Sequence, residues 1–231
     1  MGKAKPVGAA HGAVIRRSSS CVVPRVNRLS EFRLPSRRHV LAGVGLILAT
    51  PSALLAAPSQ LAFAALRNGQ KIGEQRMSFQ SAADGLTVRT QVEMAVKLGP
   101  LTLYRYRHQA DERWSGGRFE SLQTQTNANG KLFKVSAQRG ADGVEIMPAA
   151  GGTTQAPASA LPFTHWNRKI ATAPLFNPQD GKLLHETVVA TPTKLTFRGD
   201  ADIQDFYNDA GTWIGLIGKL KDGSRLEYRP I

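Results

Sequence analysis

Apolar and polar residues alternate along much of the chain, and the clearest example begins near Thr102. One set of alternate residues is mostly aromatic: Tyr104, Tyr106, His108, Ala110, Glu112 and Trp114. The residues between them are mostly charged: Arg105, Arg107, Gln109, Asp111 and Arg113. Because successive side chains of a strand point to opposite sides, this pattern predicts a β-strand with one aromatic face and one charged face.

Turn residues separate this strand from further strands. Gly116-Gly117 and Asn129-Gly130 supply the positive φ angles of tight hairpin turns, so residues 101–139 are predicted to form three consecutive antiparallel strands. The preceding segment, 86–98, alternates in the same way, and Thr90 is the only polar residue on its apolar face. In the strand before that, Gly73 is expected to mark a bulge.

The same pattern extends over the rest of the chain after residue 60. Other predicted strands cover 61–67, 70–80, 143–148, 183–191, 194–198, 202–208, 213–220 and 224–229. Residues 149–160 are expected to form a loop, and 161–174 an irregular crossing with a single helical turn near Trp166. The prediction is therefore an all-β fold, an antiparallel meander of ten or more strands in one curved sheet, a half barrel or a barrel.

The first part of the chain differs in composition from the β domain. The formal net charge is +13, and most of it lies in residues 1–57, whose only acidic residue is Glu31. The segment that starts at Ser36 has the arginine pair Arg37 and Arg38 of a twin-arginine export signal, followed by an uncharged run over 40–49. This run is shorter than the roughly 20 apolar residues that a bilayer span needs.

These features predict three regions. Residues 1–35 are expected to be a basic, disordered leader extension, 36–59 a twin-arginine signal, and 60–231 a single β domain. Export machinery would recognise Arg37 and Arg38, cleavage would fall around Ala57 to Ser59, and the mature protein would reach the periplasm without a stable membrane span. The alternative is an uncleaved amphipathic anchor.

Several functional classes are disfavoured by the sequence. The basic charge belongs mainly to the expected leader, so it does not indicate binding to nucleic acid. Cys21 is the only cysteine and precedes the arginine pair, so the exported part would have no disulfide, thiol nucleophile or thiolate zinc site. His108, His165 and His185 lack the short spacing of metal ligands, and no serine lies in a nucleophile-elbow motif. We therefore expect no metal, cofactor or catalytic residue.

The candidate ligand-binding residues come from the aromatic strand and from the crossing: Tyr104, Tyr106, His108, Glu112, Trp114, His165, Trp166 and Asn167. They would either line an apolar cavity or simply form the core. His108 and Glu112 are roughly 13 Å apart along one strand, so they cannot bond directly. The alternative is that Glu112 pairs with an inward arginine and that His108 makes a core hydrogen bond. Trp166 would be a lid over a ligand or a plug in the sheet.

Short motifs of the β domain resemble those of a known family. They are Asn68-Gly69 with Ile72-Gly73, Tyr104-Arg105-Tyr106-Arg107-His108 with Glu112-Arg113-Trp114, Thr126-Asn127 with Gly130, His165-Trp166-Asn167, and Phe206-Tyr207-Asn208 with Gly211-Thr212-Trp213. Together they resemble the uncharacterised exported bacterial family called domain of unknown function 6134, over nearly all of 61–231. His165 and Phe206 depart from it, because Tyr and Trp are common at these positions. The family has no established activity, so the resemblance carries over no catalytic residue. A looser similarity to periplasmic lipoprotein-carrier half-barrels rests on topology alone.

Three functions are compatible with these observations. The first is a non-enzymatic binding or carrier protein for an apolar small molecule or lipid. The second is a structural or assembly factor of the cell envelope. The third is a cofactor-free enzyme that uses His108 or His165, which would need one histidine close to both a carboxylate and a hydroxyl group.

Overall fold

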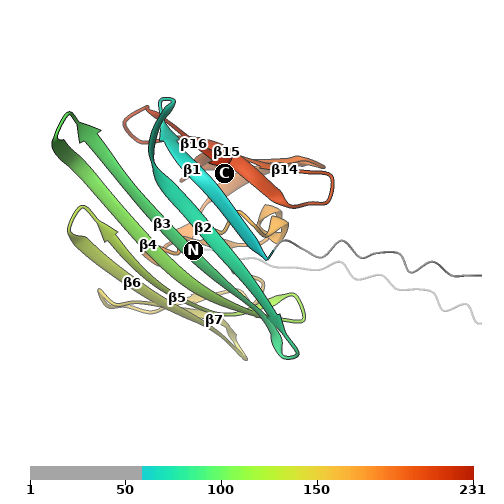
Figure 1. Ribbon diagram of the computed structural model, residues 1–231. Coiled ribbons are helices and arrows are strands. Elements are labelled where there is room, and N and C mark those ends of the chain that lie inside the picture. Colours follow the sequence, from blue (N-terminus) through green and yellow to red (C-terminus); the bar gives the residue numbers. More distant parts are fainter. Residues whose placement is uncertain (1–58) are drawn as a thin grey trace, which may run out of the picture. The chain divides into compact units, whose positions relative to one another are not determined.

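The computed structural model describes residues 59–231 (Figure 1). The predicted leader extension, the arginine pair Arg37 and Arg38 and the start of the predicted cleavage region lie outside these residues. No helix in the described part is long and apolar enough to cross a bilayer.

A 13-stranded antiparallel sheet makes up most of the domain (Figure 1). Its first eight strands are β1 (Gln60–Arg67), β2 (Gln70–Ala82), β3 (Gly85–Leu98), β4 (Leu101–Ser115), β5 (Arg118–Ala128), β6 (Lys131–Gly140), β7 (Gly143–Pro148) and β8 (Thr154–Ala156). The other five are β12 (Glu186–Thr191), β13 (Lys194–Gly199), β14 (Asp202–Tyr207), β15 (Trp213–Lys219) and β16 (Arg225–Pro230). The order in the sheet is β12-β13-β14-β15-β16-β1-β2-β3-β4-β5-β6-β7-β8, so the predicted all-β meander is confirmed.

The segment between the two meanders, 157–185, is the irregular crossing. It holds the 3-10 helix η1 (Arg168–Ala171) and a small sheet of β9 (Leu161–Pro162), β10 (Leu175–Phe176) and β11 (Leu183–Leu184). The single helical turn near Trp166 was predicted. The loop predicted over 149–160 was partly wrong, because β8 forms within it by antiparallel pairing with β7.

The β5–β6 turn and Gly73 of β2 are two places where the backbone requires particular residues for the long strands to pair. Asn129 and Gly130 both have positive φ, at 52° and 92°, as the predicted hairpin turn requires. At Gly73 an added Cβ would lie 1.9 Å from the carbonyl oxygen of Glu93, so only glycine allows β2 to approach β3 this closely. The register of β2 against β1 shifts directly beside Gly73, at the predicted bulge.

The core lies between the large sheet and the crossing. Its largest fully buried side chains include Trp213, Tyr207, Phe63, Phe119 and Phe176. Phe63 and Trp213 join strands of the two meanders, with ring centroids 4.2 Å apart, and Phe119 of β5 packs on Phe176 of the crossing at 6.0 Å. The crossing therefore covers part of the inner face of the sheet, where the aromatic residues gather.

The β3–β4 hairpin extends beyond its neighbouring strands. The last β3 residue that pairs with β2 is Met94, and the first β4 residue that pairs with β5 is Tyr106. Residues 95–105, which we call the arm, therefore pair with each other but with no further strand of the described part of the chain. The tip of this hairpin projects from the sheet in Figure 1. Leu98 continues the apolar face of the predicted strand 86–98, but it is 67% exposed, because no strand of residues 59–231 covers the arm at that level.

Candidate functional site

A cavity of about 590 Å³ lies between the inner face of the sheet and the crossing. One wall is mostly apolar and comes from β2 and β3: Ile72, Met77, Val92, Met94 and Val96. The crossing supplies the opposite wall through residues 162–165 and 177–179. At the turn between β15 and β16, the wall includes Asp222, which forms an ion pair with Arg67 of β1.

Five of the eight candidate residues line this cavity: Tyr104, Tyr106, His108, Glu112 and His165. Tyr106 also connects the two walls, because its hydroxyl donates a hydrogen bond to Gln179 Oε1 at 3.1 Å. Gln75 and Thr90 add two buried polar side chains to the inner face. The sequence pattern had indicated Thr90 as an inward polar residue, but Gln179 belongs to the crossing and had no periodic signal.

Glu112 is the most deeply buried acidic group of the cavity wall, with 2% of its surface exposed. Its Oε2 accepts hydrogen bonds from the indole nitrogens of Trp114 at 2.9 Å and Trp166 at 3.3 Å. Burial raises the pKa of Glu112 to about 7, although these hydrogen bonds oppose the rise. The expected pairing with an inward arginine was wrong, since the residues opposite Glu112 on the neighbouring strands are Val88 and Leu122.

His108 is buried and neutral at physiological pH. Its Nδ1 lies 2.7 Å from Thr126 Oγ1 on β5, and its ring stacks on Tyr106 with a centroid distance of 6.3 Å. Burial lowers the pKa of His108 to about 4, because the charged imidazolium would lose its hydration. The core hydrogen bond considered as one alternative for His108 is therefore present.

His165 has a different partner, which the sequence analysis missed. Its Nδ1 is 2.9 Å from Asp205 Oδ2, and its ring stacks on Trp213 at 5.3 Å. Asp205 is fully buried, and its other oxygen accepts a hydrogen bond from Trp213 Nε1 at 3.2 Å. The only sequence signal was an acidic residue at an inward position of β14, between Ile203 and Tyr207.

A cofactor-free acid–base enzyme would need one histidine close to both a carboxylate and a hydroxyl group. His165 bonds a carboxylate and His108 bonds a hydroxyl group, and neither bonds both within residues 59–231. The same residues contain no group of three His, Cys, Asp or Glu side chains arranged to hold a metal ion. His108 and His165 thus line the cavity, while the side chains that they bond, Thr126 and Asp205, lie outside its lining.

The remaining three candidates do not line the cavity. Trp114 is 3% exposed and packs edge-on against Trp166, with centroids 5.3 Å apart. Trp166 also packs on Phe79 of β2 at 5.5 Å, so its indole fills the space between the crossing and the sheet. The side chain of Asn167 caps η1 by accepting a hydrogen bond from the backbone N–H of Lys169. These contacts correspond to a plug and not to a lid.

We expect Trp166→Ala to lower the free energy of unfolding by about 3 kcal/mol, because a half-buried indole with two aromatic contacts would leave a cavity. It would also remove one hydrogen bond from Glu112. Chemical denaturation followed by circular dichroism measures the change. A loss below about 0.5 kcal/mol, the size typical of a surface substitution, would contradict the plug.

Comparison with other proteins supports the fold and identifies the family. No curated protein has significant similarity to the chain. A solved structure described as a beta-barrel-like protein of domain of unknown function DUF1849 from Brucella abortus is similar, with a TM-score of 0.51 and 8% sequence identity. The match covers 74% of this chain and 95% of that one, and at this identity it supports the fold alone. The model of the family Domain of unknown function (DUF6134) matches residues 63–231, and the chain belongs to that family.

Proposed function

We propose that this protein is a non-enzymatic binding or carrier protein for an apolar or amphipathic small molecule. The cavity between β2–β4 and the crossing carries the proposal. Its volume of about 590 Å³ is in the range of ligand pockets, roughly 300–1,000 Å³. An apolar wall with a few oriented polar groups is also typical of such pockets.

The chemistry of the wall favours an amphipathic ligand over a purely apolar one. One part of the wall offers apolar contact through Ile72, Val92 and Met94. The part on β4 offers hydrogen-bonding groups through His108 and Glu112. Both groups are neutral over part of the pH range near neutrality, because burial lowers the pKa of His108 and raises that of Glu112. Such groups suit a hydroxyl, amide or protonated carboxyl head better than a fixed charge.

The proposal also includes a compartment. The arginine pair at Arg37 and Arg38, followed by an uncharged run, supports export through the twin-arginine route. In the periplasm, a carrier of this kind would move amphipathic molecules that are poorly soluble in water.

Filling the cavity tests the proposal. We expect Met94→Trp to weaken binding of the apolar fluorophore N-phenyl-1-naphthylamine by at least about tenfold, which corresponds to ~1.4 kcal/mol. Met94 points into the cavity, so an indole there would occupy space that the ligand needs. A fluorescence titration of both proteins measures the affinities.

Gln91→Trp is the matched control, because Gln91 is exposed on the opposite face of the same strand. It adds the same indole to β3 without entering the cavity, so its affinity should equal that of the unchanged protein. Equal affinities for all three proteins, or no binding by the unchanged protein, would overturn the proposal.

A further inference from the structure

The arm exposes large apolar side chains that the fold does not cover. Leu98, Leu101 and Leu103 are 67%, 64% and 55% exposed. Leu132, which follows the β5–β6 turn, is 61% exposed. This turn lies beside the base of the arm, since the backbone N–H of Asn129 donates to the carbonyl oxygen of Arg105 at 2.7 Å. The apolar residues therefore gather at one end of the sheet.

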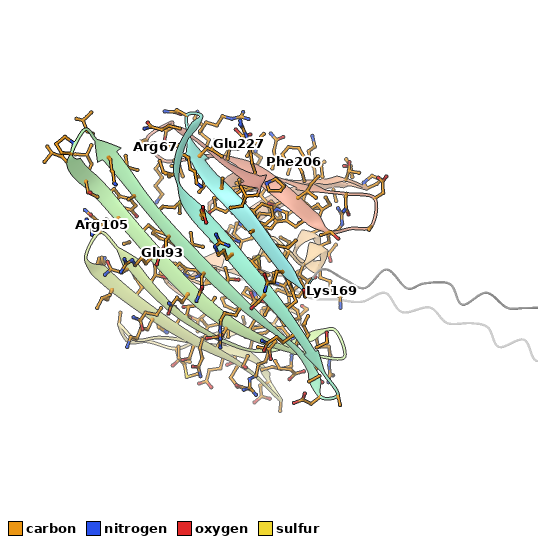
Figure 2. The ribbon with its side chains drawn as sticks, viewed as in Figure 1. Arg67, Glu93, Arg105, Lys169, Phe206 and Glu227 are labelled. Atoms are coloured by element: carbon orange, nitrogen blue, oxygen red, sulfur yellow. The ribbon has the colours of Figure 1, made fainter. Side chains whose placement is uncertain are left out.

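Basic residues surround this apolar tip. Lys97 and Arg105 lie on the arm, and Lys131 lies on the neighbouring turn; Figure 2 labels Arg105 at this end of the sheet. None of the three forms an ion pair within residues 59–231, whereas the nearby Arg107 lies 3.7 Å from Glu93. No acidic residue occurs over 95–110 or over 121–141. The tip thus combines uncovered leucines with uncompensated positive charge.

This combination fits one kind of surface better than others. A second copy of the chain would bring the same cations together, and like charges oppose such contact. An anionic bilayer accepts both features, because leucines enter its interfacial region while Lys and Arg side chains contact lipid phosphates. Scattered apolar residues are normal on a protein surface, but a cluster at the tip of a projecting hairpin indicates an interaction site.

The arm is also connected to the cavity. Val96 and Tyr104, which lie on opposite strands of the arm and pair with each other, both line the cavity wall. The cavity therefore reaches the base of the element that carries the leucines. A molecule passing between a bilayer and the cavity would follow the inner face of the arm.

We propose that the β3–β4 arm docks the protein on anionic lipid bilayers, with Leu98, Leu101 and Leu103 inserted and Lys97, Arg105 and Lys131 on the phosphates. Docking does not require that the cavity holds a ligand. A failure of docking would therefore leave the cavity proposal standing, and a cavity that binds nothing would leave docking standing.

Site-specific fluorescence tests the docking. In the full chain with Cys21→Ser, a single cysteine introduced by Thr102→Cys would carry an environment-sensitive nitrobenzoxadiazole label at the tip. The control is Gln123→Cys, at an exposed position on the outer face of β5 away from the tip. We expect vesicles of phosphatidylcholine with phosphatidylglycerol to shift the emission of the tip label to shorter wavelength and to leave the control label unchanged.

Charge and leucine variants then separate the two parts of the proposed contact. Vesicle binding should weaken on the order of 100-fold in the triple variant Lys97→Gln, Arg105→Gln and Lys131→Gln. Each cation near an anionic surface contributes about fivefold to the affinity, and the three factors multiply. Combining Leu98→Ser, Leu101→Ser and Leu103→Ser should abolish the shift. The leader is identical in all variants, so it cannot cause these differences.

Three results would overturn the proposal. One is the absence of a shift at the tip label with anionic vesicles. Another is an equal shift at both labels, which would indicate adsorption that does not involve the arm. The third is a shift that depends on protein concentration without vesicles, which would indicate that a second copy covers the tip.

Discussion

Replacing Trp213 with alanine is expected to lower the free energy of unfolding by about 4 kcal/mol, in the middle of the range for buried aromatic residues. Trp213 is 1% exposed and its ring contacts Phe63, His165 and Tyr228. The substitution would leave a cavity where β1, β15 and β16 meet the crossing. It would also leave one oxygen of the buried Asp205 without its indole donor, which adds a cost.

Two further variants make this result specific. Ile214→Ala changes the next residue, which is 41% exposed on the outer face, so its cost should be well below that of Trp213→Ala. Trp213→Phe keeps much of the packing but removes the donor to Asp205, so it should fall between the other two. Denaturant titrations of the three variants measure these differences. A loss under about 1 kcal/mol for Trp213→Ala would show that this indole is not central to the core.

The variants Glu112→Gln and His108→Gln are expected to alter the pH dependence of stability in opposite directions. Burial raises the pKa of Glu112 from 4.5 to about 7, so between these pH values the folded state holds a proton that the unfolded state has lost. Stability from Glu112 therefore falls as the pH rises through this window, by roughly 3 kcal/mol in total. Burial lowers the pKa of His108 from 6.5 to about 4, so there the unfolded state holds the extra proton. Stability from His108 rises over that window by a similar amount, roughly 3 kcal/mol.

The two contributions offset each other between pH 4.5 and 6.5 in the unchanged protein. Glu112→Gln removes the falling part, so the stability of this variant should increase with pH more steeply than that of the unchanged protein. His108→Gln removes the rising part, so the stability of this variant should fall with increasing pH when it is compared with that of the unchanged protein. Denaturation midpoints measured across this window compare the slopes, and surface groups cancel in the comparison. Identical slopes for all three proteins would rule out buried, neutral forms of these two residues.

Much of the strand arrangement could be predicted because alternation and turn residues are local signals. The inward face of β4 and the turn at Asn129-Gly130 follow directly from period two and from positive φ. β9 and β10 have only two residues each, which is too short for any period, so their pairing in the crossing could not be seen. The exposure of Leu98 was missed for another reason. Alternation indicates the face on which a residue lies, but it does not show whether another strand covers that face.

The candidate site was predictable along β4 and at one position of the crossing, His165. Tyr106, His108 and Glu112 share a strand, so their common face could be read from the sequence. Asp205 and Gln179 reach the same region from other elements, and no local pattern links them to β4. The role of Glu112 was misjudged because its partners are two indoles, one from its own strand and one from the crossing, where no periodic pattern could indicate them.

The pairing of β1 with β16 determines when the sheet can be completed during folding. Residues separated by most of the domain, such as Ala65 and Tyr228, are direct neighbours in this pair. The two meanders on either side can form hairpin by hairpin, but their union must close a very long loop, which slows folding. A nascent chain that lacks its last residues would carry two separate meanders, each with an open edge at the seam. Unpaired edges of this kind promote aggregation, so the chain stays exposed to this risk until β16 is synthesised and pairs with β1.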